Sequence, residues 1–400
     1  MLGKRRKGVL FLEFMTNDRA AHEQLLYFTS SSLSADDTQL YYLSDAGGSP
    51  NVYVKNIATG AVQKRTDNAG GAMKSYVYFR GVPYAGLAKA SMSLDAARNV
   101  LYYIQDQCVM RSDADGRIRV LRTLPQGQMT AFTHVSADGR FLCVPTTDER
   151  ALEDEDGLPR TFDGCGGLNH DIDLRVQNEG LHSTLRVVDT ETGEEVLAED
   201  VPRAWITHVQ FSPVDAGAIL YNHEWPADCG IRRMWLYRDG RHLRLREEAA
   251  GRSRADWTCH EMWYPDGASV LYHGGYAGGA YYVGRVSTQG GDNQEVALPA
   301  DFTAYGHFTM GNLHPDWLVS DGYYAQEGQS GYISILRMDW AAGTQHWVPL
   351  CLHRSPWTTQ DSHPHPIFDH ADRFVYFTGF DGEKLKVCRV AVPDSLAERG

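Results

Sequence analysis

Short apolar runs alternate with polar turns along the whole chain, and the two recur in a fixed order. Each unit contains an apolar residue, a turn of the Ser-x-Asp type, an apolar strand and a second polar turn. In the clearest copies, the turn at residues 34–37 leads into the run at 40–43, and the turn at 136–139 leads into 141–144. In each copy, turn residues stand on both sides of a run of β-branched and aromatic residues. The pattern therefore predicts antiparallel hairpins.

Seven copies of this unit follow one another, at a spacing of roughly 40–55 residues that is typical of propeller blades. Most copies are followed by a second hairpin, so a unit supplies four strands. We therefore predict an all-β fold, a single seven-bladed β-propeller of four-stranded antiparallel blades spanning residues 1–400. A β-sandwich with chance similarity between turns is the alternative. The copies begin near Ser32, Ser93, Val135, Phe211, Trp263, Leu313 and Phe368.

Two parts of the chain depart from the repeat. The apolar run near residues 9–13 belongs to no copy, and we expect it to pair with the last blade. Glu13 interrupts this run and no small-residue cleavage site follows, which favours a first strand over a signal peptide. The extra length at residues 149–182 predicts a long loop inserted after the third copy, with an acidic run at 153–156.

Composition narrows the range of partners. A formal net charge of −13 argues against a nucleic-acid partner. It also means that an anionic substrate needs local positive charge to bind. The seven cysteines are odd in number and lack a Cys-x-x-Cys pair, which favours a reducing, cytoplasmic compartment. No apolar stretch is long enough to span a membrane, and the oligomeric state is left open.

The richest motif is Gln-Asp-Ser-His-Pro-His-Pro at residues 360–366. A proline disfavours helical geometry in the residue before it, so we expect His363 and His365 both to be extended. Side chains two residues apart in an extended chain lie on one face, and Gln360 brings an amide oxygen to the same place. These donors suit a metal ion. Two surface histidines in a stiff loop are the alternative.

Other histidines occupy a matching place in the repeat. His208, His260 and His307 stand just before the inner turns of the fourth, fifth and sixth copies. Equivalent positions in consecutive blades face one axis, which predicts a metal or catalytic cluster. Alternatively, each histidine caps its own blade by hydrogen bonding to a turn.

We expect the ligand set to comprise His307, Gln360, His363 and His365. This set carries no charge, so a bound divalent cation keeps its full charge. The amide oxygen favours Mn²⁺ or a similar hard ion, although Zn²⁺ would also bind the imidazoles well.

These segments resemble the oligogalacturonate lyases, polysaccharide lyase family 22. The resemblance covers most of residues 200–395, is strongest at 360–366, and fades towards the N-terminus. It includes the segments around His223, Arg233 and His307, and the run Cys-His-Glu-Met-Trp at 259–263, which is similar to the family's Thr-His-Glu-Phe-Trp. Trp225 stands where the family usually has a small residue, which leaves the exact sugar open.

The resemblance implies a seven-bladed propeller that holds Mn²⁺ through His307, Gln360, His363 and His365. It further implies that His260 is the base and that Arg233 is essential. The family acts inside the bacterial cell on short galacturonides. His208 and His223 are candidates for substrate binding.

The implied reaction is a β-elimination that removes the proton at C5 of a uronate. A neutral histidine suits the base, and a cation with an arginine would stabilise the enolate-like transition state. Two alternatives stay open. One is a lyase acting on another uronate-containing oligosaccharide, and the other is a non-catalytic propeller, similar to the TolB-type scaffold, that binds protein partners.

Overall fold

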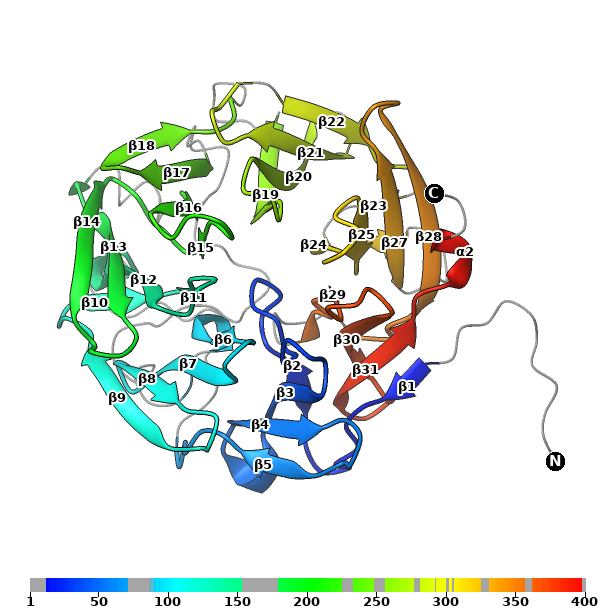
Figure 1. Ribbon diagram of the computed structural model, residues 1–400, viewed down its shortest axis with the longest axis horizontal. Coiled ribbons are helices and arrows are strands. Elements are labelled where there is room, and N and C mark those ends of the chain that lie inside the picture. Colours follow the sequence, from blue (N-terminus) through cyan, green and yellow to red (C-terminus); the bar gives the residue numbers. More distant parts are fainter. Residues whose placement is uncertain are drawn as a thin grey trace.

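Seven antiparallel sheets of four or five strands each are arranged around a ring, with one edge of each sheet facing the centre (Figure 1). The predicted seven-bladed β-propeller is confirmed. The computed structural model describes residues 12–70, 87, 89–152, 179–224, 233–247, 256–276, 281–291, 293–299, 302–303, 306–324, 331–356 and 362–397. The helices in these ranges are all too short to cross a bilayer.

The first four blades follow the chain in order. Blade 1 contains β2 (Glu23–Leu25), β3 (Gln39–Ser44), β4 (Asn51–Asn56) and β5 (Val62–Lys64). Blade 2 contains β6 (Ser93–Asp95), β7 (Val100–Gln105), β8 (Cys108–Ser112) and β9 (Ile118–Thr123). Blade 3 contains β10 (Gln128–Thr130), β11 (His134–Val135), β12 (Phe141–Asp148), β13 (His182–Asp189) and β14 (Glu195–Pro202). Its inner strand is split, because β10 and β11 both pair with β12. Blade 4 contains β15 (Val209–Phe211), β16 (Ala218–Asn222), β17 (Met234–Arg238) and β18 (Arg241–Arg244).

The remaining blades complete the ring. Blade 5 contains β19 (Asp256–Trp263), β20 (Ser269–Tyr276), β21 (Tyr281–Ser287) and β22 (Asn293–Ala297). Blade 6 contains β24 (Phe308–Met310), β25 (Trp317–Ser320), β27 (Tyr332–Asp339) and β28 (Thr344–Leu352). Blade 7 contains β29 (Ile367–Phe368), β30 (Phe374–Phe380), β31 (Leu385–Ala391) and β1 (Leu12–Phe14). Outside the blades, β23 (Phe302–Thr303) pairs with β26 (Tyr323–Tyr324). The helices are short: η1 (Ala46–Gly48), η3 (Lys89–Ser91), η4 (Glu149–Leu152) and α2 (Asp394–Ala397).

Burial follows the position of a strand within its blade. Every residue of β25 is buried, because both faces of this second strand pack against a neighbouring blade. Leu318 joins an apolar cluster with blade 5, whereas the next residue, Val319, joins one with blade 7. The outermost strand β14 instead alternates between half-buried and exposed residues over most of its length. Inner runs are therefore continuously apolar and outer ones alternate.

The recurring Ser-x-Asp turn has the same hydrogen bonds in different blades. Ser34 Oγ donates to Asp36 Oδ1 at 2.6 Å and accepts from Gln39 N at 2.9 Å. In blade 3, Ser136 Oγ donates to Asp138 at 2.6 Å and accepts from the backbone five residues later at 2.9 Å. The serine thus satisfies the backbone at the start of the next strand, which explains why the motif recurs.

The ring closes between the two ends of the chain, as the sequence predicted. Strand β1 pairs with β31 in the register Leu12↔Val390, so the N-terminal segment supplies the outer strand of blade 7. Figure 1 shows the two strands side by side. Most of the insertion at 149–182 lies outside the described residues, but its ends join β12 to β13 inside blade 3. The assignment of residues 1–400 to one domain stays a prediction.

Lys386 fastens blade 7 to blade 1 at this junction. Its Nζ atom donates to the carbonyl oxygens of Asp18 and Ala21 and lies 3.0 Å from Glu23 Oε2. Both side chains of the ion pair are almost fully buried. Removing one partner of such a pair leaves an uncompensated charge in the interior.

We therefore expect Lys386→Met to lower the free energy of unfolding by about 3–5 kcal/mol, as measured by urea denaturation. Adding Glu23→Gln should restore part of the loss, because the stranded charge is then removed. The control is Lys64→Met, which breaks an exposed ion pair with Asp67 and should change stability by less than about 1 kcal/mol. Equal losses in both variants would contradict a special role for Lys386.

Candidate functional site

Three histidines from two neighbouring blades converge near the axis. His307 precedes β24, and His363 and His365 precede β29. One ring nitrogen from each lies within 4.8 Å of the others. The Nε2 atoms of His307 and His365 are 3.2 Å apart, and all three side chains are buried. Neutral imidazoles so arranged can hold a divalent cation.

Asp321, which follows β25, orients this cluster. Its carboxylate accepts hydrogen bonds from His307 N at 2.6 Å, His307 Nδ1 at 3.0 Å and His365 N at 3.0 Å. Because a carboxylate accepts only, His307 carries its proton on Nδ1 and has a lone pair on Nε2. Burial alone would raise the pKa of Asp321, but His307 lowers it below its ordinary value.

The backbone at His365 corrects one expectation. His365 has a φ of +47°, in the left-handed region, so the segment is not extended at both histidines. Tertiary hydrogen bonds override the local preference, since Pro364 O accepts from Thr378 N at 2.8 Å and His365 N is bound by Asp321. The His363 and His365 rings still face one place, with centroids 5.8 Å apart.

His260 approaches this cluster from blade 5 through a β-bulge. The register of β19 against β20 shifts between Cys259 and Met262, which places one extra residue opposite Tyr272. His260 has a φ of +52°, and its ring centroid lies 4.5 Å from that of His307. Bulges and left-handed residues of this kind re-aim a side chain at functional sites.

The contacts of His260 fix its tautomer. Nδ1 lies 2.7 Å from His273 Nε2 and 3.1 Å from the carbonyl oxygen of Gly306. A carbonyl only accepts, so Nδ1 carries the proton and Nε2 has the lone pair. Burial, with help from His307 and His273, lowers the pKa of His260 well below its ordinary value. His260 is therefore neutral near pH 7 and presents an unprotonated Nε2 atom.

The other buried histidines of the cluster are also held neutral. Burial lowers the pKa of His363 to about 3, with a smaller contribution from His307. Burial likewise lowers the pKa of His365 well below its ordinary value. Protons therefore do not compete with a cation for these nitrogens near neutral pH.

Arg233 lies between two buried carboxylates. Its Nε atom is 2.9 Å from Glu261 Oε2, and Nη1 is 3.1 Å from Glu224 Oε1. Burial alone would raise the pKa of Glu224, but Arg233, followed by His208, holds it well below its usual range. The two carboxylates thus fix the orientation of the guanidinium.

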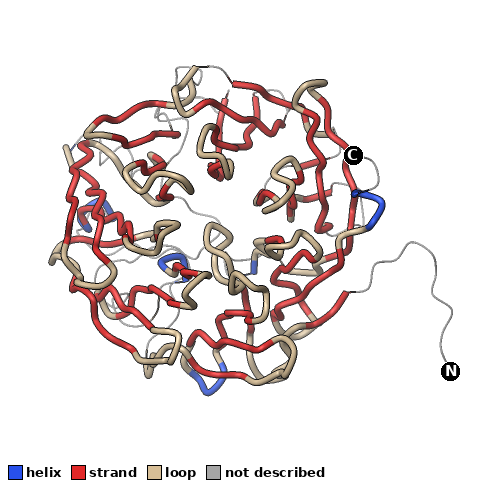
Figure 2. The backbone as a smooth tube through the Cα atoms, viewed as in Figure 1, coloured by secondary structure: helices blue, strands red, loops and turns tan. Residues whose placement is uncertain are grey.

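His208 lies on the opposite flank of the axis and binds a residue from blade 1. Its Nε2 atom is 3.3 Å from the hydroxyl of Tyr27, and its Nδ1 atom is 2.8 Å from Thr207 Oγ1. The next residue, Phe28, packs its ring against those of His260, His307 and His365. The loop after β2 thus carries an aromatic pair into the histidine cluster, and Figure 2 shows this loop reaching towards the centre of the ring.

Sequence reasoning missed Tyr27, Phe28 and Lys89. Lys89 is buried, donates from Nζ to Gln24 Oε1 at 2.5 Å, and lies just before the inner strand of blade 2. A search for chemically reactive residues before every inner strand would have found it. No repeat-based signal marks Tyr27 or Phe28, because they lie in the loop after β2 and not just before an inner strand.

The roles of two further sequence candidates stay predictions. Gln360 lies outside the described residues, so its place as a ligand stays a prediction. His223 stacks on Trp235 at 5.0 Å and tilts against Tyr221, all within blade 4. Burial, followed by His242, lowers its pKa to about 4. Its role in substrate binding also stays a prediction.

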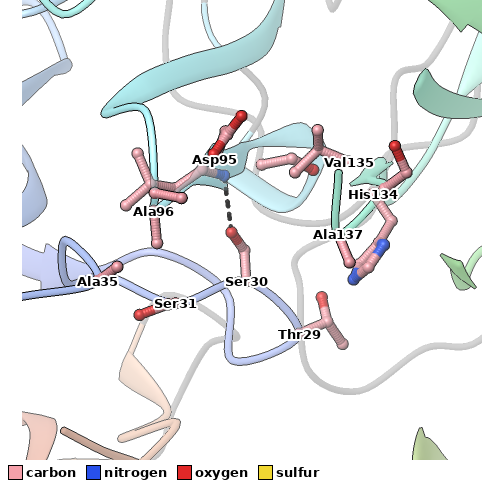
Figure 3. Close-up of a pocket in the computed structure, with 13 residues that line it drawn as sticks. Thr29, Ser30, Ser31, Ala35, Asp95, Ala96, His134, Val135 and Ala137 are labelled. Atoms are coloured by element: carbon pink, nitrogen blue, oxygen red, sulfur yellow. Dashed lines mark hydrogen bonds between the residues drawn. The ribbon is translucent and has the colours of Figure 1, made fainter. Parts of the chain in front are cut away.

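A separate cavity of about 280 Å³ lies at the other end of the inner strands (Figure 3). The turns of blades 1 to 3 line it, and Ser30 Oγ accepts from Leu94 N at 2.9 Å beside it. Its lining is mainly small and neutral, with Asp95 held by Arg98. It shares no residue with the histidine cluster.

Comparison with known proteins identifies the family. A family profile described as oligogalacturonate lyase matches residues 180–396, which is more than half of the chain. This chain belongs to the oligogalacturonate lyase family. It is 26% identical over 229 residues to the oligogalacturonate lyase of Dickeya dadantii, covering 52% of this chain and 55% of that protein. The chain thus spans about half the length of the curated relatives that it matches.

Two solved structures share the fold over nearly the whole chain. One is an oligogalacturonate lyase in complex with manganese, with a TM-score of 0.76, 20% identity and coverage of 98% of this chain and 96% of that one. The other is an oligogalacturonate lyase from Vibrio parahaemolyticus, with a TM-score of 0.75, 21% identity and coverage of 97% and 98%. The N-terminal third, where the sequence resemblance fades, therefore has the same propeller fold.

We expect Arg233→Met to lower the free energy of unfolding by about 3–5 kcal/mol, because it strands two buried carboxylates. Adding Glu224→Gln and Glu261→Gln should recover much of this loss in urea denaturation. Arg238→Met on β17 is the control, since Arg238 makes a partly exposed ion pair with Asp215. That variant should lose less than about 1 kcal/mol. An unchanged stability of Arg233→Met would show that the carboxylates do not depend on it.

Proposed function

We propose that this protein is a metal-dependent lyase that cleaves oligogalacturonides by β-elimination in the cytoplasm, with Mn²⁺ as the cofactor. Family membership supports the reaction, and the names of the relatives indicate the substrate class. The five described cysteines are free, which agrees with a reducing compartment. The convergence of His307, His363 and His365 beside the neutral base His260 is the observation that carries the proposal.

The described residues fit a divalent cation. His307, His363 and His365 would hold it through nitrogen, and Asp321 fixes the tautomer of His307 as such supporting carboxylates do in metal sites. The buried His365 Nδ1 makes no hydrogen bond with the described residues. The His365 ring contacts His307 through Nε2, which is the atom that would bind the cation. Manganese is proposed because one relative was solved in complex with it. Gln360 is proposed as a further ligand from its sequence position.

Each step of the elimination can be assigned to a residue of this site. When bound, the cation supplies positive charge that stabilises a uronate carboxylate as its α-carbon is deprotonated. His260 Nε2 takes the C5 proton, and Gly306 O and His273 keep the other ring nitrogen protonated throughout. The C5–H electron pair forms the C4=C5 bond, the C4–O bond breaks, and the departing oxygen takes up a proton.

Arg233 supplies a fixed positive charge next to the base. Glu224 and Glu261 hold the guanidinium in place, so its orientation needs no rearrangement when substrate binds. Because two carboxylates already match the guanidinium, the charge of a bound cation would be what draws an anionic sugar to a protein whose net charge is −13.

The decisive assay follows the ultraviolet absorbance of the new C4=C5 bond, which is conjugated with the carboxylate. The protein with Mn²⁺ should raise this absorbance on oligogalacturonate. His260→Asn should lower kcat by about 10²–10⁴-fold, the usual contribution of a general base, and still bind Mn²⁺. Asparagine is chosen because it tolerates the positive φ at this position.

His363→Ala should lose both the metal and the activity. His314→Gln is the matched control, because His314 follows β24 at the end away from His307 and stacks on Trp317. It should keep full activity. Absence of any absorbance change with oligogalacturonate and Mn²⁺ would refute the proposal, and a panel of other uronate oligosaccharides would test the alternative substrates.

Asp321→Asn should weaken Mn²⁺ binding by about 10–100-fold, the usual cost of losing a supporting carboxylate. The amide also loses the charge that holds His307 in its tautomer. Equilibrium dialysis with Mn²⁺ measures the effect directly. Unchanged affinity in a folded variant would show that Asp321 acts on the fold alone.

A further inference from the structure

A second set of metal-ligating side chains lies beside the cluster assigned to Mn²⁺. Cys259, His260 and His273 each offer one donor atom, and these atoms lie within 4.8 Å of one another. Cys259 and His273 are a cross-strand pair on β19 and β20, so their side chains share one face of the sheet. The bulge brings His260 to the same place.

The donors of this set differ in kind from those of its neighbour. A thiolate with two imidazoles favours borderline and soft ions such as Zn²⁺ and Cd²⁺, whereas Mn²⁺ prefers harder ligands. His273 is almost fully buried, and its Nδ1 atom makes no hydrogen bond with the described residues. Its Nε2 atom faces His260 Nδ1 at 2.7 Å, so these two nitrogens could bind one cation together.

We propose that Cys259, His260 and His273 form an inhibitory site for a soft divalent cation. The inhibition rests on the function proposed above, whereas cation binding does not. A cation must bind His260 through Nδ1, the nitrogen that faces His273. The Nδ1 proton then moves to Nε2, the thiol proton leaves to solvent, and the 2.7 Å contact between the rings opens to about 3.3 Å, the spacing of two nitrogens on one tetrahedral ion.

This change of tautomer blocks the reaction. Once Nε2 carries the proton, His260 has no lone pair to accept the C5 proton of a sugar. A bound cation would thus stop elimination without touching the substrate and without occupying His307, His363 or His365.

The test uses Cd²⁺ as the probe on the Mn²⁺-loaded protein. The native protein should develop a near-ultraviolet thiolate-to-metal band on adding Cd²⁺, and lyase activity should fall in parallel. Cys259→Ser should abolish the band, keep the basal activity and raise the Cd²⁺ concentration for half inhibition by about tenfold or more. Cys351→Ser, at a half-buried cysteine outside the cluster, should behave as the native protein.

Two further variants separate the possible failures. His273→Gln retains the thiol and should also weaken Cd²⁺ binding. With this second variant, the test does not depend on Cys259→Ser alone, which could misfold. His363→Ala should keep the band, because it affects only the neighbouring cluster. A band that persists in Cys259→Ser, or no band in the native protein, would overturn the site. Cd²⁺ binding with unchanged activity would overturn the inhibition, and a band in a protein without lyase activity would refute only the function.

Discussion

The buried carboxylate of Asp321 holds together the two segments that supply the clustered histidines. It binds the backbone and ring of His307 from blade 6 and the backbone of His365 from the chain that enters blade 7. Without this acceptor, the left-handed residue His365 would lose the contact that fixes it. The spacing of 3.2 Å between the two Nε2 atoms therefore depends on a residue that is not itself a member of the cluster.

Charge at the axis is arranged so that His260, His363 and His365 remain neutral. Arg233 is balanced by Glu224 and Glu261, and Asp321 is engaged by His307. Because burial disfavours protonation of the imidazoles, the site offers lone pairs to a cation instead of repelling it. The buried ion pairs with Glu224 and Glu261 thus fix the orientation of the Arg233 guanidinium.

The sequence was sufficient to predict the ring and the convergence of His307, His363 and His365, because a repeat places equivalent residues at equivalent distances from one axis. Closure by the N-terminal strand was expected because the apolar run near residues 9–13 belongs to no copy of the repeat, and β1 does pair with β31. Local rules failed at His365, where tertiary hydrogen bonds overrode the preference imposed by Pro366. Local rules also could not predict the bulge at His260, because a bulge depends on the register between two strands. Tyr27 and Phe28 were missed because they lie in the loop after β2, whereas the repeat drew attention to residues just before the inner strands.

The bulge in β19 has two consequences that cannot be separated. It turns His260 towards His307, and it also sets the ring against His273 and Gly306, which fix the proton on Nδ1. A base whose lone pair is defined by contacts at its other nitrogen is efficient only while those contacts last. Any ligand that takes the place of the Nδ1 proton therefore reverses the tautomer. The proposed role of His260 as the base and its proposed sensitivity to a competing ligand therefore depend on the same hydrogen bond.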